Sequence, residues 1–342
     1  MQQHLFIIIL LCKLILFLNR NSLIKQTINI ICVYRGERMS NQFDVMIIGG
    51  GIAGLQAAIQ LGRYKHKIAV IDSNDGRSSI CRCYHNILGW PDGVSGETLR
   101  NLGKMHAKRY GVSFINNEVI QVNKQKQSFK IDCRGGDSYT AKRILIATGV
   151  KDNIPPIKNI YKCLGLTIYV CPDCDGYEVA DKHVIVIGSN MPGANMALTL
   201  SYFTNQITFI NQDWKQLDRE ALKKLKQNGI SYIQEDVEEI LLEEDTADFM
   251  GVRLKSGDVI PAERGFLGFG GNEVRSELAT QLGIERTENK HVIVDPRTKK
   301  TNVEHVWAAG DITVHSEQTT IAMGDGMQAA IWIHKSLMEE KS

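Results

Sequence analysis

The 342-residue sequence lacks the features that mark nucleic-acid-binding, membrane-spanning or secreted proteins. Aromatic residues make up only 7%, and the formal net charge is +2 with lysine and arginine scattered, so there is no basic stripe for nucleic acid. After residue 40, no apolar run reaches the roughly 20 residues that cross a bilayer. The eight cysteines are too sparse for the disulfide scaffold of a small secreted domain. We therefore expect a cytoplasmic protein.

Residues 1–40 differ in composition from the rest of the chain. Leu5–Leu18 is almost wholly apolar, but about 14 residues that include Lys13 are too few to span a membrane. Neither a basic head nor a small-residue cleavage site marks a signal peptide. We favour a start at Met39, with residues 1–38 as translated leader. The alternative is a real helix that associates with a membrane.

Strand and helix patterns alternate from Phe43 onward. A first βαβ unit is predicted over residues 44–72 and a second over residues 182–210, with its helix at 194–203. Such units specify a parallel sheet covered by helices, and two of them about 140 residues apart indicate two Rossmann-like domains. Further elements are expected at 97–110 and 320–338 (helices) and at 118–122, 129–133, 143–149 and 303–311 (strands).

The first βαβ unit carries a glycine fingerprint between its strand and its helix. Gly49 permits a tight turn, Gly51 lets a pyrophosphate approach the backbone, and Gly54 allows close packing of helix on strand. The pyrophosphate would lie at the helix N-terminus, at Ile52 and Ala53, where free N–H groups favour an anion. A dinucleotide site is therefore predicted here.

Two acidic residues at strand ends extend this predicted site. Asp72 follows Gly49 by 23 residues, where a carboxylate can accept the ribose hydroxyls. The fingerprint alone does not separate FAD from NAD. Gly310 and Asp311, however, lie between an apolar strand and a long helix, as in flavin enzymes whose aspartate binds the ribityl chain. FAD is thus the favoured cofactor.

A Cys-x-x-Cys pair, Cys171 and Cys174, lies between the two nucleotide-binding units and suggests electrons passing between a flavin and a disulfide. One alternative is a zinc site completed by Cys81, Cys83 and His85, although C-x-C is a poor spacing for zinc. Another is a purely structural pair. We favour the redox couple and predict no metal.

The order of these motifs resembles the thioredoxin reductase-like group of FAD-dependent pyridine nucleotide-disulfide oxidoreductases, of the low molecular weight type, over about residues 43–338. The matching pieces are Gly49–Gly54, His85–Gly89, Ala147–Gly149, Cys171–Gly176 and Ala308–Asp311. The resemblance implies an α/β fold of two Rossmann-like three-layer domains. An FAD-binding domain would comprise 41–155 and 268–342, and an inserted NAD(P)-binding-like domain, 156–267, would carry the dithiol.

The same resemblance assigns roles in the site. It implies that Cys174 faces the flavin, that Cys171 exchanges with substrate, and that Asp175 is the general acid/base. It further implies a homodimer and, as partner, a thioredoxin-like protein or a small dithiol or disulfide. Additional flavin contacts are expected from Asn86, Thr148, Gly149, Gln318 and Thr319.

The second glycine turn, Gly188–Gly193, departs from the family pattern. Asn190 replaces the middle glycine, and Asn211 stands where an acid or an arginine cluster would bind the ribose of NADH or NADPH. These residues argue against an NAD(P)H site. Four functions therefore stay open: an NAD(P)H-driven reductase, a flavin thiol oxidase that uses oxygen, a reductase with a ferredoxin-type donor, and a redox sensor without turnover.

Overall fold

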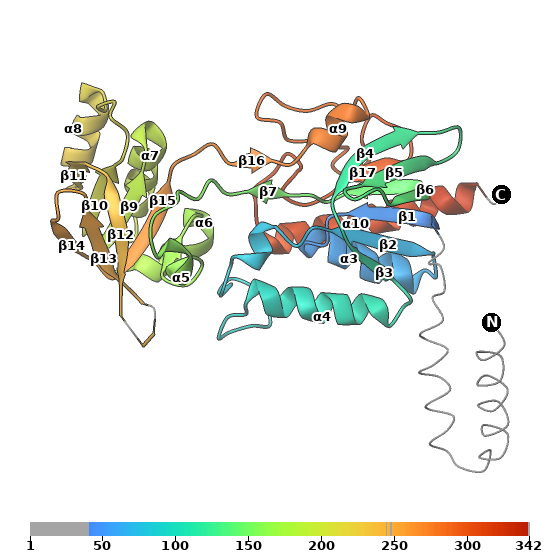
Figure 1. Cartoon of the computed structure of the whole chain (residues 1–342), viewed down its shortest axis with the longest axis horizontal. Helices are drawn as coiled ribbons and strands as arrows, with labels where there is room; N and C mark the ends of the chain where they lie inside the picture. Colours follow the sequence, from blue (N-terminus) through green and yellow to red (C-terminus); the bar gives the residue numbers. More distant parts are fainter. Residues whose placement is uncertain (1–40, 244, 247, 341–342) are drawn as a thin grey trace, which may run out of the picture. The chain divides into compact units, whose positions relative to one another are not determined.

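The computed structural model describes residues 41–340 except 244 and 247, so the predictions for residues 1–40 lie outside the described part. Two parallel sheets dominate the described chain, and each is covered on both faces (Figure 1). Within residues 41–340, no helix combines the length and hydropathy needed to span a membrane.

The first sheet contains the first predicted βαβ unit. Its parallel strands run in the order β3-β2-β1-β6-β17. Its elements are β1 (Gln42–Ile48), α3 (Ile52–Arg63), β2 (Ile68–Asp72), β3 (Ser113–Asn116), β6 (Ser138–Ile146) and β17 (Val306–Ala308). Two antiparallel strands, β4 (Val119–Lys124) and β5 (Phe129–Cys133), continue from β6.

Strand β1 is uniformly apolar because both of its faces are buried. Val45 and Ile47 share one core with α3 and with α10 (Thr319–Glu339). Met46 and Ile48 point to the opposite core, which includes Ile131 of β5. Figure 1 shows α3 and α10 on one side of this sheet and β4 and β5 on the other. The carboxyl ends of its strands, where the glycine turn lies, are thereby held rigid.

The second sheet repeats the arrangement, with parallel strands in the order β11-β10-β9-β15-β8. These are β8 (Ile168–Tyr169), β9 (Val184–Gly188), β10 (Ile207–Asn211), β11 (Ser231–Gln234) and β15 (Arg264–Gly268). Helices α7 (Asn190–Leu200) and α8 (Arg219–Gln227) pack on one face. The antiparallel strands β12 (Val237–Leu242), β13 (Phe249–Leu254) and β14 (Val259–Pro261) cover the other. Both sheets reverse their strand order beside the glycine turn, as dinucleotide-binding folds do.

The remaining helices and strands lie between the strands of these sheets or in the segments that join them. They are η1 (Arg77–Ser79), α4 (Gly96–Lys108), β7 (Val150–Lys151), α5 (Ile160–Cys163), α6 (Pro172–Asp175), η2 (Gly176–Val179), β16 (Glu273–Val274) and α9 (Glu277–Gln281). The predicted α/β class with Rossmann-like sheets is confirmed.

Some predicted boundaries were wrong. The strand expected at 143–149 begins at Ser138, because its first half pairs with β5 as well as with β1. The strand expected at 303–311 shrinks to Val306–Ala308, and the helix expected from 194 begins at Asn190. Pro192 does not break this helix, since a proline in the first turn removes only an N–H that has no partner within the helix.

Candidate active site

The three glycines of the first turn are needed for two different reasons. Gly49 has φ +106°, and a Cβ on it would overlap the carbonyl oxygen of Ala147. A Cβ on Gly54 would overlap the carbonyl oxygen of Gly49. A Cβ on Gly51, in contrast, would meet nothing within 4 Å. Packing therefore demands Gly49 and Gly54, whereas Gly51 leaves open space in front of the N-terminus of α3.

That space belongs to a cavity of about 780 Å³ at the carboxyl ends of the first sheet. This volume lies in the range of about 300–1,000 Å³ that small-molecule sites occupy. Ten predicted cofactor-binding residues line it: Gly49, Gly51, Ile52, Ala53, Asp72, Thr148, Gly149, Gly310, Asp311 and Thr319. Gly54 lies behind the turn, and Gln318, with Asn86 bound to it, contacts Cys174 at the edge of the cavity.

Asp311 presents an acceptor that nothing in the described chain satisfies. Its Oδ1 is buried without a hydrogen-bond partner, while its Oδ2 accepts from Arg77 at 3.3 Å. Burial raises the pKa of Asp311 although Arg77 opposes the rise. Leaving a buried acceptor unpaired costs roughly 1–3 kcal/mol, so this oxygen indicates a place for a ligand hydroxyl.

One of the two carboxylate oxygens of Asp72 already accepts a hydrogen bond within the protein. Its Oδ2 accepts from the buried Arg100 at 2.8 Å, and Arg100 also donates to Asn74 at 2.6 Å. Arg100 thus fixes the carboxylate at the end of β2, beside Gly50 of the turn. The remaining oxygen of Asp72 is the one available to a ribose hydroxyl.

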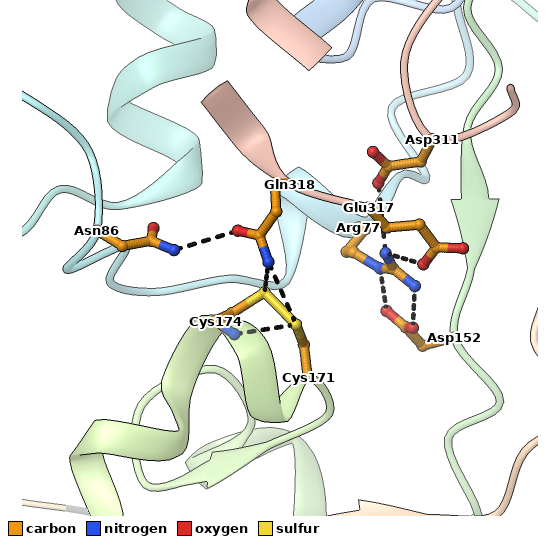
Figure 2. The surroundings of a disulfide bond; sticks show 8 residues. All are labelled: Arg77, Asn86, Asp152, Cys171, Cys174, Asp311, Glu317 and Gln318. Atoms are coloured by element: carbon orange, nitrogen blue, oxygen red, sulfur yellow. Dashed lines mark hydrogen bonds and ion pairs between the residues drawn. A yellow bond between two sulfur atoms is a disulfide. The ribbon is translucent and has the colours of Figure 1, made fainter. Parts of the chain in front are cut away.

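A cluster around Arg77 was not predicted from the sequence. Its guanidinium binds both oxygens of Asp152 at 2.9 and 2.6 Å, and it also reaches Glu317 at 2.7 Å (Figure 2). Burial alone would lower the pKa of Arg77, but its contacts with Asp152 and Glu317 raise it above the ordinary value. Arg77 therefore stays charged and ties the chain after β7 to the segment that precedes α10.

Cys171 and Cys174 form a disulfide at the start of α6. The backbone N–H of Cys174 donates to Cys171 Sγ at 3.2 Å, and Cys174 lines the cavity described above. Gln318 Nε2 lies 3.3 Å from Cys174 Sγ and 3.9 Å from Cys171 Sγ. Asn86 Nδ2 donates to Gln318 Oε1 at 3.2 Å (Figure 2). The disulfide thus lies at the edge of the cavity, with Cys174 on the cavity side.

The ionisable groups near the disulfide have different pKa values. Burial, helped by the negative charge of Glu178, raises the pKa of Asp175 to about 7. Burial likewise raises the pKa of Cys81 to about 12, and it raises that of Cys83. Asp175 can therefore gain or lose a proton near neutrality, while Cys81 and Cys83 stay as thiols. Across residues 41–340 apart from 244 and 247, no group of three metal-ligating side chains comes together.

At the second glycine turn, the protein itself uses or lacks several of the backbone N–H groups that a nucleotide would need. The backbone N–H of Asn190 donates to the side chain of Asn211 at 2.9 Å, and Asn211 is fully buried. Pro192 has no N–H, and the N–H of Gly193 is donated to Ser189. The turn therefore offers a pyrophosphate few of the donors that such a site uses.

The glycines that the second turn retains have packing roles. A Cβ on Gly188 would overlap the carbonyl oxygen of Gly268, and one on Gly193 would overlap the ring of Phe209. A bound pyrophosphate would require a glycine at position 190, but the residue there is Asn190, which has φ +50°. Asn190 was predicted to hinder a nucleotide, whereas the role of Pro192 was not predicted, although a proline inside the fingerprint is visible in the sequence.

Comparison with known proteins agrees with this geometry. The family model described as pyridine nucleotide-disulphide oxidoreductase matches residues 43–326. The chain belongs to this family. The predicted resemblance is confirmed, and the protein is a thioredoxin reductase-like, FAD-dependent disulfide oxidoreductase.

Individual relatives match this oxidoreductase over nearly their whole length. It is 29% identical to the thioredoxin reductase of Rickettsia conorii over 304 residues, 86% of this chain and 97% of that one. It is 27% identical to the thioredoxin reductase of Treponema pallidum over 300 residues, 85% and 96% of the two chains. The crystal structure of a putative thioredoxin reductase from Bacillus anthracis matches with a TM-score of 0.76 and 26% identity, covering 87% of this chain and all of that one (100%).

Proposed function

We propose that the protein is a dithiol/disulfide oxidoreductase that passes two electrons between bound FAD and the Cys171–Cys174 disulfide. The observation that carries this proposal is that Cys174 lines the same cavity as Gly51, Asp311 and Thr319. A sulfur of the proposed redox couple and the glycines of the dinucleotide fingerprint therefore line one cavity. The resemblance predicted this role for Cys174.

The residues present fit FAD. The unpartnered Oδ1 of Asp311 is an acceptor for a ribityl hydroxyl, and the open space at Gly51 admits the pyrophosphate to the N-terminus of α3. Asp72 would hold the adenosine ribose, and Thr148 and Thr319 would border the ring system. Bound FAD would supply a two-electron acceptor or donor beside Cys174.

The dithiol would exchange with substrate through ordinary thiol–disulfide chemistry. A partner thiolate attacks Cys171 Sγ, the Cys171–Cys174 bond breaks, and Cys174 leaves as a thiolate. A second partner thiolate then displaces Cys171, which releases the partner as a disulfide. The partner has lost two electrons and two protons. The enzyme dithiol holds the electrons, and Asp175 takes up a proton that is released. Run backwards, the same steps reduce a disulfide.

The role proposed for Asp175 predicts a specific pH dependence. Its pKa of about 7 means that the carboxylate needed to accept a proton is lost as the pH falls below 7. With a dithiol as electron donor, the limiting rate should therefore rise through pH 7. In Asp175→Asn it should drop by about 10²–10⁴-fold and lose that pH step. The check is a steady-state pH profile, with Asp173→Asn on the exposed side of α6 as control. An unchanged pH profile in Asp175→Asn would rule out the role.

The electron donor is a further part of the proposal. Because Asn211 occupies the N–H of Asn190 and Pro192 has none, we propose that NAD(P)H is a poor donor here. Electrons would enter through the dithiol instead and leave to oxygen or another acceptor, as in a flavin thiol oxidase. The family as a whole is described by its use of pyridine nucleotides. This chain has a second parallel sheet, and its glycine turn offers few free N–H donors.

Anaerobic bleaching of the flavin distinguishes the donors. Micromolar NADPH or NADH should leave the flavin absorbance unchanged over the time in which a dithiol bleaches the same sample. The physical reason is the small number of free N–H donors at the second turn. The dithiol reaction is the positive control for competent enzyme. Rapid bleaching by either pyridine nucleotide would make the protein an NAD(P)H-driven reductase.

The remaining assignments follow from the same proposal. We assign 41–155 and 268–342 to the FAD-binding domain and 156–267 to the inserted domain; the second parallel sheet begins at Ile168, and its strand β15 ends at Gly268, one residue beyond the assigned boundary. The partner is a thioredoxin-like protein or a small dithiol or disulfide. The homodimer and the cytoplasmic location stay predictions.

A further inference from the structure

Gln318 directs its side chain to the disulfide rather than to its own helix. It is the N-cap residue of α10, yet its side chain caps no backbone N–H of that helix. Its amide nitrogen lies 3.3 Å from Cys174 Sγ and 3.9 Å from Cys171 Sγ. Figure 2 shows Gln318 between Asn86 and the two sulfurs. A helix-capping role therefore does not account for this glutamine.

Asn86 determines which end of the Gln318 amide faces sulfur. Its Nδ2 donates to Gln318 Oε1 at 3.2 Å, so the Gln318 carbonyl is occupied and the NH₂ group is turned toward Cys174. A thiolate accepts hydrogen bonds and cannot donate them, so this orientation suits a negative sulfur. The opposite orientation would place two acceptors against each other.

Two acidic side chains, Asp175 and Glu178, lie on α6 and η2, near the disulfide at the start of α6. Burial, together with the negative charges of Glu178 and Asp175, raises the pKa of the Cys83 thiol, so these two carboxyl groups oppose a thiolate at Cys83. The cation drawn in Figure 2, Arg77, is bound by three carboxylates: Asp152, Asp311 and Glu317. Among the side chains of the described residues, Gln318 is a hydrogen-bond donor to Cys174 Sγ.

We propose that Gln318, oriented by Asn86, stabilises the thiolate that Cys174 becomes when the disulfide opens. This inference rests on the proposed exchange at Cys171 and Cys174. In thiol–disulfide exchange the better leaving group is the sulfur whose thiolate is more stable, so the amide directs partner attack to Cys171. A stabilised reduced form also makes the disulfide easier to reduce. Gln318 thus acts on both the rate and the equilibrium of the dithiol.

The test measures disulfide opening itself, in FAD-loaded enzyme under anaerobic conditions. Dithiothreitol opens the Cys171–Cys174 bond, samples are quenched with acid and an alkylating agent, and mass spectrometry counts the modified cysteines. Gln318→Met keeps the length of the side chain and removes the donor. We expect opening to slow about tenfold, since a hydrogen bond to a charged group is worth about that factor or more. The midpoint against a glutathione redox buffer should become more negative.

Two further variants distinguish the orientation of the Gln318 amide from a general effect of a substitution on α10. Asn86→Asp replaces the donor to Gln318 Oε1 with an acceptor, which turns the Gln318 NH₂ group away from sulfur. We expect it to slow opening similarly although Gln318 is intact. Gln328→Met makes the same change elsewhere on α10 and should leave rate and midpoint unchanged. FAD content, read from the flavin absorbance, checks that each variant is loaded.

The outcomes are distinct. Slower opening and a more negative midpoint in both Gln318→Met and Asn86→Asp support the inference. Wild-type rate and midpoint in Asn86→Asp, or in a loaded Gln318→Met, overturn it. If dithiothreitol fails to open the disulfide in the wild-type protein, the proposed function itself fails, whatever the variants do.

Discussion

Cys171→Ser and Cys174→Ser should each lower dithiol turnover by more than about 10³-fold while FAD stays bound. Serine cannot form the disulfide that accepts electrons from the partner, so neither half of the dithiol suffices alone. FAD retention is expected because the groups assigned to hold it, such as Gly51 and Asp311, are untouched. Steady-state turnover and flavin absorbance of the purified variants measure the two effects.

Cys83→Ser is the matched control for this pair. Cys83 is a free cysteine near the site, and burial raises the pKa of its thiol, so it is not primed for exchange. Turnover of Cys83→Ser should therefore stay within about twofold of wild type. Colourless Cys171→Ser and Cys174→Ser proteins would mean that the disulfide supports the fold of the flavin site rather than the reaction.

Gly51→Leu should remove FAD without unfolding the protein. A side chain at Gly51 meets no protein atom within 4 Å, and the residue has φ −73°, which any amino acid adopts. Leucine would instead fill the space proposed for the pyrophosphate. We expect the Kd for FAD to rise by at least about 100-fold, equivalent to about 2.8 kcal/mol. Fluorescence titration of apoprotein with FAD, beside its thermal unfolding midpoint, measures both properties.

Gly324→Leu is the control: it adds the same side chain at another glycine where no protein atom is in the way. Gly324 is exposed on α10, and a Cβ there also meets nothing within 4 Å. Its variant should keep wild-type affinity for FAD, since it does not line the cavity. Tight FAD binding by Gly51→Leu would show that the pyrophosphate does not approach this turn.

Local sequence signals predicted the elements that hold the flavin cavity. A strand, a glycine turn and a helix adjacent in sequence, as at Gly49–Gly54, are a short-range pattern whose geometry depends on few other residues. Gly310 and Asp311 were predicted from their place between an apolar strand and a long helix, and Thr148 and Gly149 from the resemblance; the structure brings all four to one cavity. Their individual roles toward FAD stay predictions.

The Arg77 cluster could not be predicted because its partners are remote in sequence. Asp152 is 75 residues away and Glu317 is 240 residues away. No periodic or spacing signal links such positions, and only the folded chain brings them together. The same holds for Gln318, which was predicted to line the flavin site but lies against a disulfide 144 residues before it. Sequence patterns identified the motifs, while contacts between them required the structure.

The second glycine turn shows how structure refines a motif. From sequence, Asn190 alone argued against a nucleotide site. The structure adds that Gly188 and Gly193 are explained by packing and that Asn211 occupies the N–H of Asn190. Retention of a glycine therefore does not by itself indicate a ligand. The informative glycine is one that packing does not require, such as Gly51.

In the proposed reaction, electrons reach the flavin through Cys171 and Cys174. The most direct test of this claim is rapid anaerobic mixing of a dithiol with wild-type enzyme and with FAD-loaded Cys171→Ser, followed at the flavin absorbance band. We predict that the wild-type flavin bleaches within the turnover time, whereas the flavin of Cys171→Ser stays oxidised. Equal bleaching in the two proteins would contradict the claim, because the flavin would then be reduced without the disulfide.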